Sequence, residues 1–164
     1  MALQSVLVTD TNIWIDLENG GILAEVFLLP RKFLIPDLAI RELIRPRWLT
    51  LQALGLEAHE LAAEQVEELY RLRQVHNNLS AIDLAAFLLA KTLDATLLTG
   101  DRRLMELANT HGLSVHGVLW LLDEMIHFRV ILPRQAANAL RRMLEQGAKL
   151  PEDECRIRVK NWSS

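Results

Sequence analysis

Four acidic residues could gather their side chains in one crevice: Asp10, Glu42, Asp83 and Asp101. Asp10 and Asp101 each follow a short apolar run typical of a β-strand, at residues 6–8 and 95–98, and each precedes a helix-like segment. The carboxyl ends of parallel strands face the crevice where α/β proteins bind ligands. Carboxylates about 4 Å apart repel by around 4 kcal/mol per pair at an effective dielectric of roughly 20. Such a cluster therefore requires a cation.

The composition of this acid set indicates which cation it would hold. Oxygen ligands without Cys or His favour Mg²⁺ or Mn²⁺ over Zn²⁺. Mg²⁺ retains water molecules that a substrate phosphate can displace, and one bound water could become the nucleophile. The pattern therefore predicts hydrolysis of a phosphodiester bond.

Each acid also has a purely structural interpretation. Asp10 could organise a turn, Glu42 could face solvent, and Asp101 could cap the helix that follows it. Ser80 to Asp83 matches the S-x-x-D capping box. Helix caps are far commoner than sites, so the functional interpretation depends on all four acids occurring together.

Length and composition favour one well-packed domain. The chain has 164 residues, of which 51% are hydrophobic, and its formal net charge of −3 argues against a broadly basic surface. A single cysteine, Cys155, excludes an intramolecular disulfide. No stretch approaches a membrane span and the amino terminus lacks an export pattern, so we expect a cytoplasmic protein without a membrane partner.

Periodicity predicts alternating strands and helices. We expect residues 1–148 to form the domain and residues 149–164 to form a tail, which is either a short helix or a flexible end. Residues 48–61 are ambiguous, although a strand near 56–61 is favoured. Strands are expected at 6–9, 32–35, 95–99 and 112–117, and helices at 11–18, 22–29, 36–44, 62–75, 80–93, 102–110, 118–128 and 134–146.

Four segments carry a resemblance to a known family. VTDTNIWIDL, the acid in IRELI, SAIDLAAFLLA and LLTGDRRLMELA follow the order seen in PIN-domain ribonucleases, over roughly residues 5–130. The resemblance implies a three-layer α/β/α fold with a short, mostly parallel sheet. It also implies that Asp10, Glu42, Asp83 and Asp101 are catalytic ligands of Mg²⁺ or Mn²⁺. Thr9, Asn12 and Thr99 would support them.

The size of the chain resembles the VapC-like toxins of toxin–antitoxin pairs, which implies an RNA substrate and an antitoxin partner. One departure stands out, because many relatives carry another Asp or Asn just after the fourth acid. Here Arg102 and Arg103 occupy that place, and Glu106 could substitute. The two arginines could bind substrate phosphate or simply face solvent.

Two other functions remain open. A noncatalytic member of the same fold could bind RNA or protein, with the acids kept as caps or a regulatory metal site. A phosphatase is disfavoured, because Asn12 stands where the usual motif has a second Asp.

The apolar residues between positions 13 and 29 exceed what one small domain would hide, which predicts a homodimer.

Overall fold

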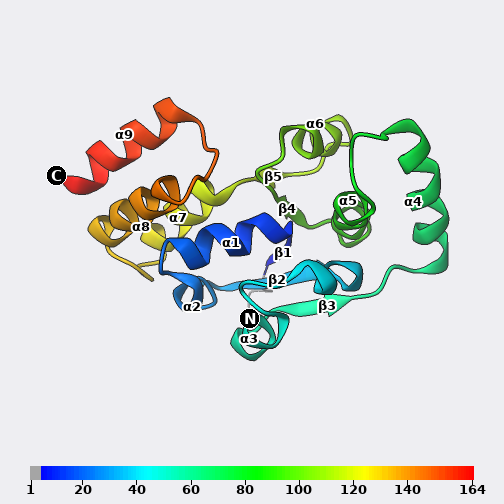
Figure 1. The fold of residues 1–164 in the computed structure, drawn as a ribbon, viewed down its shortest axis with the longest axis horizontal. Coiled ribbons are helices and arrows are strands. Elements are labelled where there is room, and N and C mark those ends of the chain that lie inside the picture. The colour runs from blue at the N-terminus through cyan, green and yellow to red at the C-terminus, as the bar shows by residue number, and fades with distance from the viewer. Residues whose placement is uncertain (1–4) are drawn as a thin grey trace.

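A computed structural model describes residues 5–164 and shows a central sheet of five strands (Figure 1). The strands lie in the order β3-β2-β1-β4-β5, and all neighbouring pairs are parallel. Their bounds are β1 Ser5–Thr9, β2 Arg31–Pro36, β3 Glu57–His59, β4 Thr96–Leu98 and β5 Val115–His116.

The chain changes direction across the sheet at its centre. From β1 it moves to β2 and β3 on one side, and then returns to β4 and β5 on the other. Leu7 of β1 is therefore opposite both Phe33 of β2 and Thr96 of β4. Ligands of open α/β sheets bind at such a switch point, outside the carboxyl ends of the strands.

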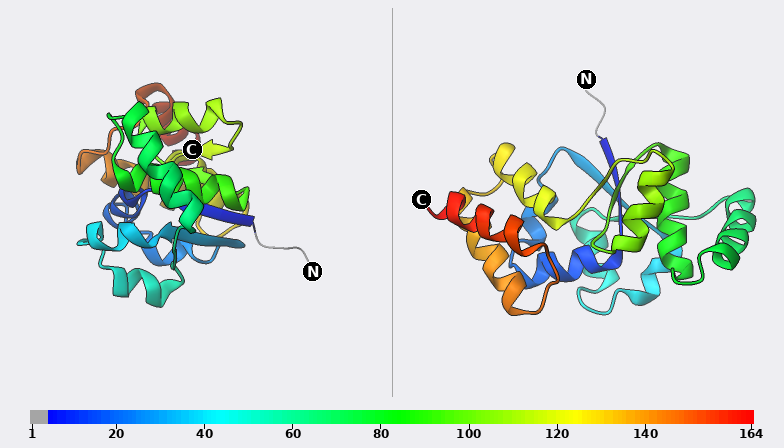
Figure 2. Two further views of the ribbon diagram at one scale, coloured as in Figure 1. Left: turned by 90° about the vertical axis from the view of Figure 1, so that its right-hand side faces the viewer. Right: turned by 90° about the horizontal axis from the view of Figure 1, so that it is seen from above.

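Helices cover both faces of the sheet (Figures 1 and 2). Alternate strand residues serve two separate cores, because successive side chains point to opposite faces. Leu7 belongs to the core that contains buried residues of α1, α7 and α8, whereas Val8 belongs to the core that contains buried residues of α5 and α6. The expected three-layer α/β/α architecture is confirmed. The helices are α1 Thr11–Asn19, α2 Leu23–Val26, η1 Asp37–Glu42, α3 Trp48–Leu54, α4 Ala63–Val75, α5 Ala81–Leu93, α6 Arg102–Thr110, α7 Val118–His127, α8 Pro133–Glu145 and α9 Glu152–Ser163.

Two expected helices are shorter or tighter than the sequence pattern predicts. Within residues 22–29 only Leu23–Val26 is α-helical, since the next amides, those of Phe27 and Leu28, bond three residues back. Residues 36–44 form the 3₁₀ helix η1 instead of an α-helix, with Leu43 also bonding three residues back. Apolar spacing alone does not separate these hydrogen-bond patterns.

The ambiguous segment 48–61 contains both a helix and a strand. Helix α3 ends before Gly55, whose φ of 129° is a conformation that side-chain-bearing residues rarely adopt. Strand β3 then covers only three residues of the favoured range.

The apolar residues behind the homodimer prediction are mostly buried within the chain itself. Trp14 stacks on Phe27 with ring centroids 5.2 Å apart, and both rings meet Phe33 edge to face. Ile13, Ile22, Val26 and Leu29 are also buried, whereas Leu28 is 71% exposed. The packing of this one chain accounts for most of the surplus.

The end of the chain is a docked helix. Cys155 of α9 is buried, and Arg158 makes hydrogen bonds to both carboxylate oxygens of Asp123 on α7, the shortest at 2.8 Å. Arg141 of α8 donates to Ser163 at 2.7 Å. Within residues 5–164, no helix combines the length and apolar character needed to cross a bilayer.

Two leucines of the first thirty residues provide a matched test of this packing. Leu17 on α1 is fully buried, so Leu17→Ala should lower the free energy of unfolding by roughly 2–5 kcal/mol. Leu28→Ala should change it by less than about 1 kcal/mol, because that side chain is already in solvent. Urea denaturation measures both, and equal losses would contradict the described core.

Candidate functional site

The four predicted acids occupy one edge of the sheet. Asp10 directly follows β1, and Asp101 follows β4 after a two-residue connection. Glu42 ends η1, which leaves the carboxyl end of β2. Asp83 lies in the first turn of α5, which runs back to β4 and therefore begins at this same edge. The strands that lead to three of these acids are neighbours in the order β2-β1-β4.

Two threonine hydroxyls connect Asp10 to two of the other acids. The Thr99 hydroxyl donates to Asp10 Oδ2 at 2.9 Å and accepts the Asp101 backbone N–H at 3.0 Å. The Thr11 hydroxyl lies 3.4 Å from Asp10 Oδ1 and 3.3 Å from Glu42 Oε2. Asp10 is thus the centre of the cluster, with both of its oxygens in polar contact.

Asp83 and Asp101 also act as helix caps. Asp83 Oδ2 accepts the Ser80 backbone N–H at 3.0 Å, and Ser80 Oγ accepts that of Asp83 at 3.0 Å. Asp101 Oδ1 accepts the amides of Arg103 and Leu104 at 2.9 and 3.4 Å. Within residues 5–164, the second oxygen of each carboxylate has no hydrogen bond and stays available to a ligand.

Burial and repulsion make the charge of Asp10 costly. Asp10 is only 6% exposed, and this burial raises the pKa of its carboxyl group. The negative charge of Asp83 also raises this pKa, whereas the hydrogen bond from Thr99 and the nearby backbone N–H groups of Thr11 and Asn12 lower it. Asp10 and Asp83 therefore repel each other in the folded chain.

The donor set suits a hard divalent cation, although it is not preassembled. Within the described part of the chain, no three His, Cys, Asp or Glu side chains are already grouped to hold an ion. Every available donor is a carboxylate or hydroxyl oxygen, which are the ligands that Mg²⁺ and Mn²⁺ prefer. A cation beside Asp10 would also offset the cost of burying its negative charge. By its chemistry, the cluster therefore fits such an ion.

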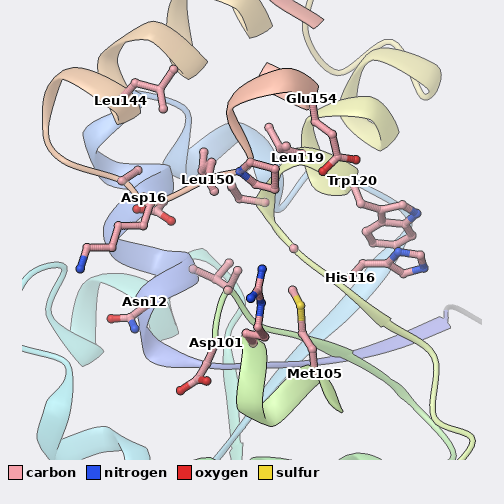
Figure 3. Close-up of a pocket in the computed structure, with 18 of the residues that line it drawn as sticks. Asn12, Asp16, Asp101, Met105, His116, Leu119, Trp120, Leu144, Leu150 and Glu154 are labelled. Atoms are coloured by element: carbon pink, nitrogen blue, oxygen red, sulfur yellow. The ribbon is translucent and has the colours of Figure 1, made fainter. Parts of the chain in front are cut away.

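A large pocket opens beside Asp101, with a volume of about 1260 Å³. Helix α1, the start of α6, the β5–α7 segment and the α8–α9 connection form its walls (Figure 3). We name it the α1–α9 pocket, and its lining residues are Asn12, Ile13, Ile15, Asp16, Gly100, Asp101, Arg102, Met105, His116, Gly117, Val118, Leu119, Trp120, Asp123, Leu144, Gly147, Ala148, Lys149, Leu150, Pro151, Glu152, Glu154 and Arg158.

Asp16 is a pocket residue that the sequence analysis did not single out. Burial, and secondarily the charge of Asp10, raise its pKa from 3.8 to about 6. The available signal was its spacing, since Asn12 and Asp16 are four residues apart and share one face of α1. Both line the α1–α9 pocket.

The three residues expected to support the acids lie in three different surroundings. Thr99 contacts Asp10 directly, as described above. Thr9 instead accepts a hydrogen bond from the Trp14 indole at 2.8 Å, so it orders the core beneath the site. Asn12 is exposed at the pocket.

The two arginines after the fourth acid differ from each other in their surroundings. Arg102 is exposed and lines the pocket, whereas Arg103 donates to the Asn78 carbonyl at 3.4 Å. Only Arg102 is therefore placed to meet a molecule in the α1–α9 pocket.

Comparisons with known proteins agree with this geometry. A family model described as a PIN domain, DUF3368, matches residues 6–164. A solved PilT N-terminus domain protein from the hyperthermophilic archaeon Sulfolobus solfataricus P2 is similar in fold, with a TM-score of 0.52 and 17% sequence identity. The similarity covers 72% of this chain and 91% of that one, and supports the expected PIN-like fold. No curated protein matches the chain.

Because the pKa of Asp16 is raised, Asp16→Asn should stabilise the fold by an amount that depends on pH. The folded chain retains this proton between pH values of about 4 and 6 while the unfolded chain has lost it, so the acid destabilises the fold increasingly as pH rises. In EDTA, Asp16→Asn should raise the unfolding free energy by roughly 1–2 kcal/mol above about pH 7, after a discount for partial solvent screening. Near pH 4 the gain should be small.

Urea denaturation across this pH range measures the effect. Asp94→Asn is the matched control, because Asp94 is exposed at the end of α5 and asparagine tolerates its left-handed conformation. A gain from Asp16→Asn that does not vary with pH would contradict the described surroundings of Asp16.

Thr99 allows a second stability test, centred on Asp10. Thr99→Val removes the hydroxyl that serves both Asp10 and the Asp101 amide, and should cost roughly 2–4 kcal/mol. Thr99→Ser keeps the hydroxyl and loses one buried methyl group, at a cost of about 1 kcal/mol. Denaturant titration at neutral pH compares them, and a valine variant as stable as the serine variant would exclude this role.

Proposed function

The chain belongs to the PIN-domain family, and on this premise we propose that it is a metal-dependent endoribonuclease that hydrolyses phosphodiester bonds of RNA. Asp10, Glu42, Asp83 and Asp101 are its proposed catalytic and metal-binding residues, and Mg²⁺ or Mn²⁺ its cofactor. The single observation that carries the proposal is the buried Asp10 carboxylate at the sheet switch point, linked through hydroxyls to Glu42 and Asp101.

The residues of the chain have distinct tasks in this proposal. Thr99 and Thr11 fix the orientation of the Asp10 carboxylate, so that the carboxylate need not rotate to bind a ligand. Asp83 and Asp101 each hold one oxygen against a helix amino terminus and offer the other to the site. A divalent ion held there supplies activation of water and stabilisation of the charge on phosphate.

Hydrolysis joins a water oxygen to phosphorus and breaks the bond to the leaving oxygen, which takes up a proton. Arg102 is placed to bind a phosphate of the substrate, because it is exposed at the pocket next to Asp101. This contact would orient the RNA strand relative to the four acids.

The finer physiological proposal is a toxin that acts on cytoplasmic RNA and is restrained by an antitoxin protein. Its support is the size of the chain, which resembles that of VapC-like toxins, together with its PIN-domain motifs. We also retain the homodimer within this proposal. Ile44 and Leu49 are each more than 70% exposed, and apolar side chains of this kind favour an isologous contact.

A noncatalytic role in binding RNA or protein is the second candidate. The observation that favours it is the capping by Asp83 and Asp101, which gives these two acids a structural function independent of any ion. Capping does not explain Asp10, because its side chain makes no capping hydrogen bond to α1 although it precedes that helix.

Asp10→Asn discriminates between the two candidates. Removing the central charge should lower the rate of Mn²⁺-dependent cleavage of single-stranded RNA by on the order of 10²-fold or more, since metal stabilisation contributes several kcal/mol. EDTA should abolish cleavage by the unmodified chain. Asp94→Asn removes a remote charge and should leave the rate unchanged. Cleavage that persists in Asp10→Asn, or is absent from the parent protein, would refute the nuclease proposal.

A further inference from the structure

The α1–α9 pocket exceeds what the hydrolysis of a phosphodiester requires. Its volume of about 1260 Å³ lies above the range of roughly 300–1,000 Å³ that is usual for small-molecule sites. It begins at Gly100–Arg102, beside the acid cluster, and continues to the α8–α9 connection. A pocket of this extent next to the proposed reaction centre suits a segment of a chain molecule better than a single small ligand.

Most of the wall is apolar. Ile15 on α1, Trp120 on α7 and Leu150 after α8 contribute from separate elements, so apolar surface is presented from several directions. Nucleobases that leave the stack are bound between aromatic or apolar side chains. The wall chemistry therefore fits an unstacked base.

The Asp16 carboxylate is the unusual group in this wall. It lies across the pocket from Trp120, above Asp101 and below Leu144 in the view of Figure 3. Within residues 5–164, its side chain accepts no hydrogen bond and forms no salt bridge. The Asp16 oxygens are not among the buried atoms that lack a partner, so they are accessible from the pocket and can accept hydrogen bonds from a ligand that brings donors.

We propose that the α1–α9 pocket binds an unpaired guanine base of the RNA substrate, with the two Asp16 carboxylate oxygens accepting hydrogen bonds from the guanine N1–H and N2 amino groups. The proposal rests on the proposed ribonuclease function, since it assigns that same substrate a base preference beside the cleaved bond.

The choice of guanine follows from donor geometry. An ionised carboxylate only accepts hydrogen bonds, so it pairs best with two adjacent donors. On their Watson–Crick edges, adenine and cytosine place an acceptor nitrogen beside their amino group, and uracil flanks its N–H with two carbonyl oxygens. Guanine alone offers an N–H beside an amino group on that edge.

Two cations of the pocket could hold the phosphates that flank this base. Arg102 and Lys149 line it, and neither forms a salt bridge in the described part of the chain. Arg158 also lines the pocket, but it is already paired with Asp123. Because Arg102 neighbours Asp101, a phosphate bound there would lie between the base pocket and the acid cluster. This continuity favours RNA over an arginine-bearing protein segment as the partner of Asp16.

Binding of short oligouridines with one central guanosine or adenosine tests the inference. Fluorescence anisotropy with the full chain in EDTA reports affinity without cleavage. We expect the guanosine oligonucleotide to bind about tenfold more tightly, the scale of one bidentate base contact. Replacing guanosine by inosine removes only the N2 amino group and should lose part of this preference.

Asp16→Asn should abolish the preference, because the amide places a donor opposite a donor. Asp94→Asn is the matched control, since it makes the same substitution at an exposed position outside the pocket and should keep the preference. Equal binding of the two oligonucleotides by the unmodified chain, or a preference that survives Asp16→Asn, would overturn the inference.

The base-pocket proposal and the nuclease proposal can each be refuted without the other. Metal-dependent cleavage without a guanine preference would refute only this base pocket. A guanine preference abolished by Asp16→Asn, in a chain that never cleaves RNA, would refute only the nuclease function.

Discussion

The buried carboxylate of Asp10 is the constraint on which the site depends. A charged group with only 6% exposure must be compensated, and here the compensation comes from the hydroxyls of Thr99 and Thr11. Asp83 works against it, because its negative charge raises the Asp10 pKa further. Keeping Asp10 and Asp83 close together lowers the stability of the fold, and packing alone does not explain why both acids are there. Binding of a divalent cation gives this arrangement a physical reason.

The topology creates this constraint. Because β1 lies between β2 and β4, acids that follow three neighbouring strands or their connections reach the same edge of the sheet. The helices that begin at this edge also direct their amino-terminal N–H groups toward it. Asp83 and Asp101 therefore cap their helices and, in the proposed function, also serve the site. Capping and ligand binding are compatible here, since each carboxylate has two oxygens.

The carboxyl-terminal elements add a second layer to the site. Arg158 ties α9 to α7 through Asp123, and the connection from α8 to α9 then closes one wall of the α1–α9 pocket. The pocket thus combines residues from the beginning, middle and end of the chain (Figure 3). Its position beside Asp101 places the proposed base pocket next to the proposed metal site.

Local signals in the sequence were sufficient for most of the fold. The apolar strands that end at Asp10 and Asp101, and the capping box at Ser80, each predict their element from neighbouring residues alone. The extent of α2 and the 3₁₀ form of η1 could not be predicted, because they depend on how the chain turns between packed elements. The hydroxyl of Thr99 was identified as a support of the site.

The surroundings of Asp16 lay beyond sequence reasoning. Its spacing from Asn12 shows which face of α1 it occupies, but not what that face meets. The raised pKa of Asp16 depends on burial in the assembled fold and on the charge of Asp10. The pocket wall around it comes from residues more than a hundred positions further along the chain, such as Leu150. No local pattern contains that information.

Calorimetric titration of Mn²⁺ into the purified chain tests the central claim most directly, because it measures the ion itself and not its consequence. The account predicts saturable binding at neutral pH that Asp10→Asn abolishes and that Asp83→Asn and Asp101→Asn each weaken. Binding of equal strength in the unmodified chain and all three variants, or no binding at all, would contradict it.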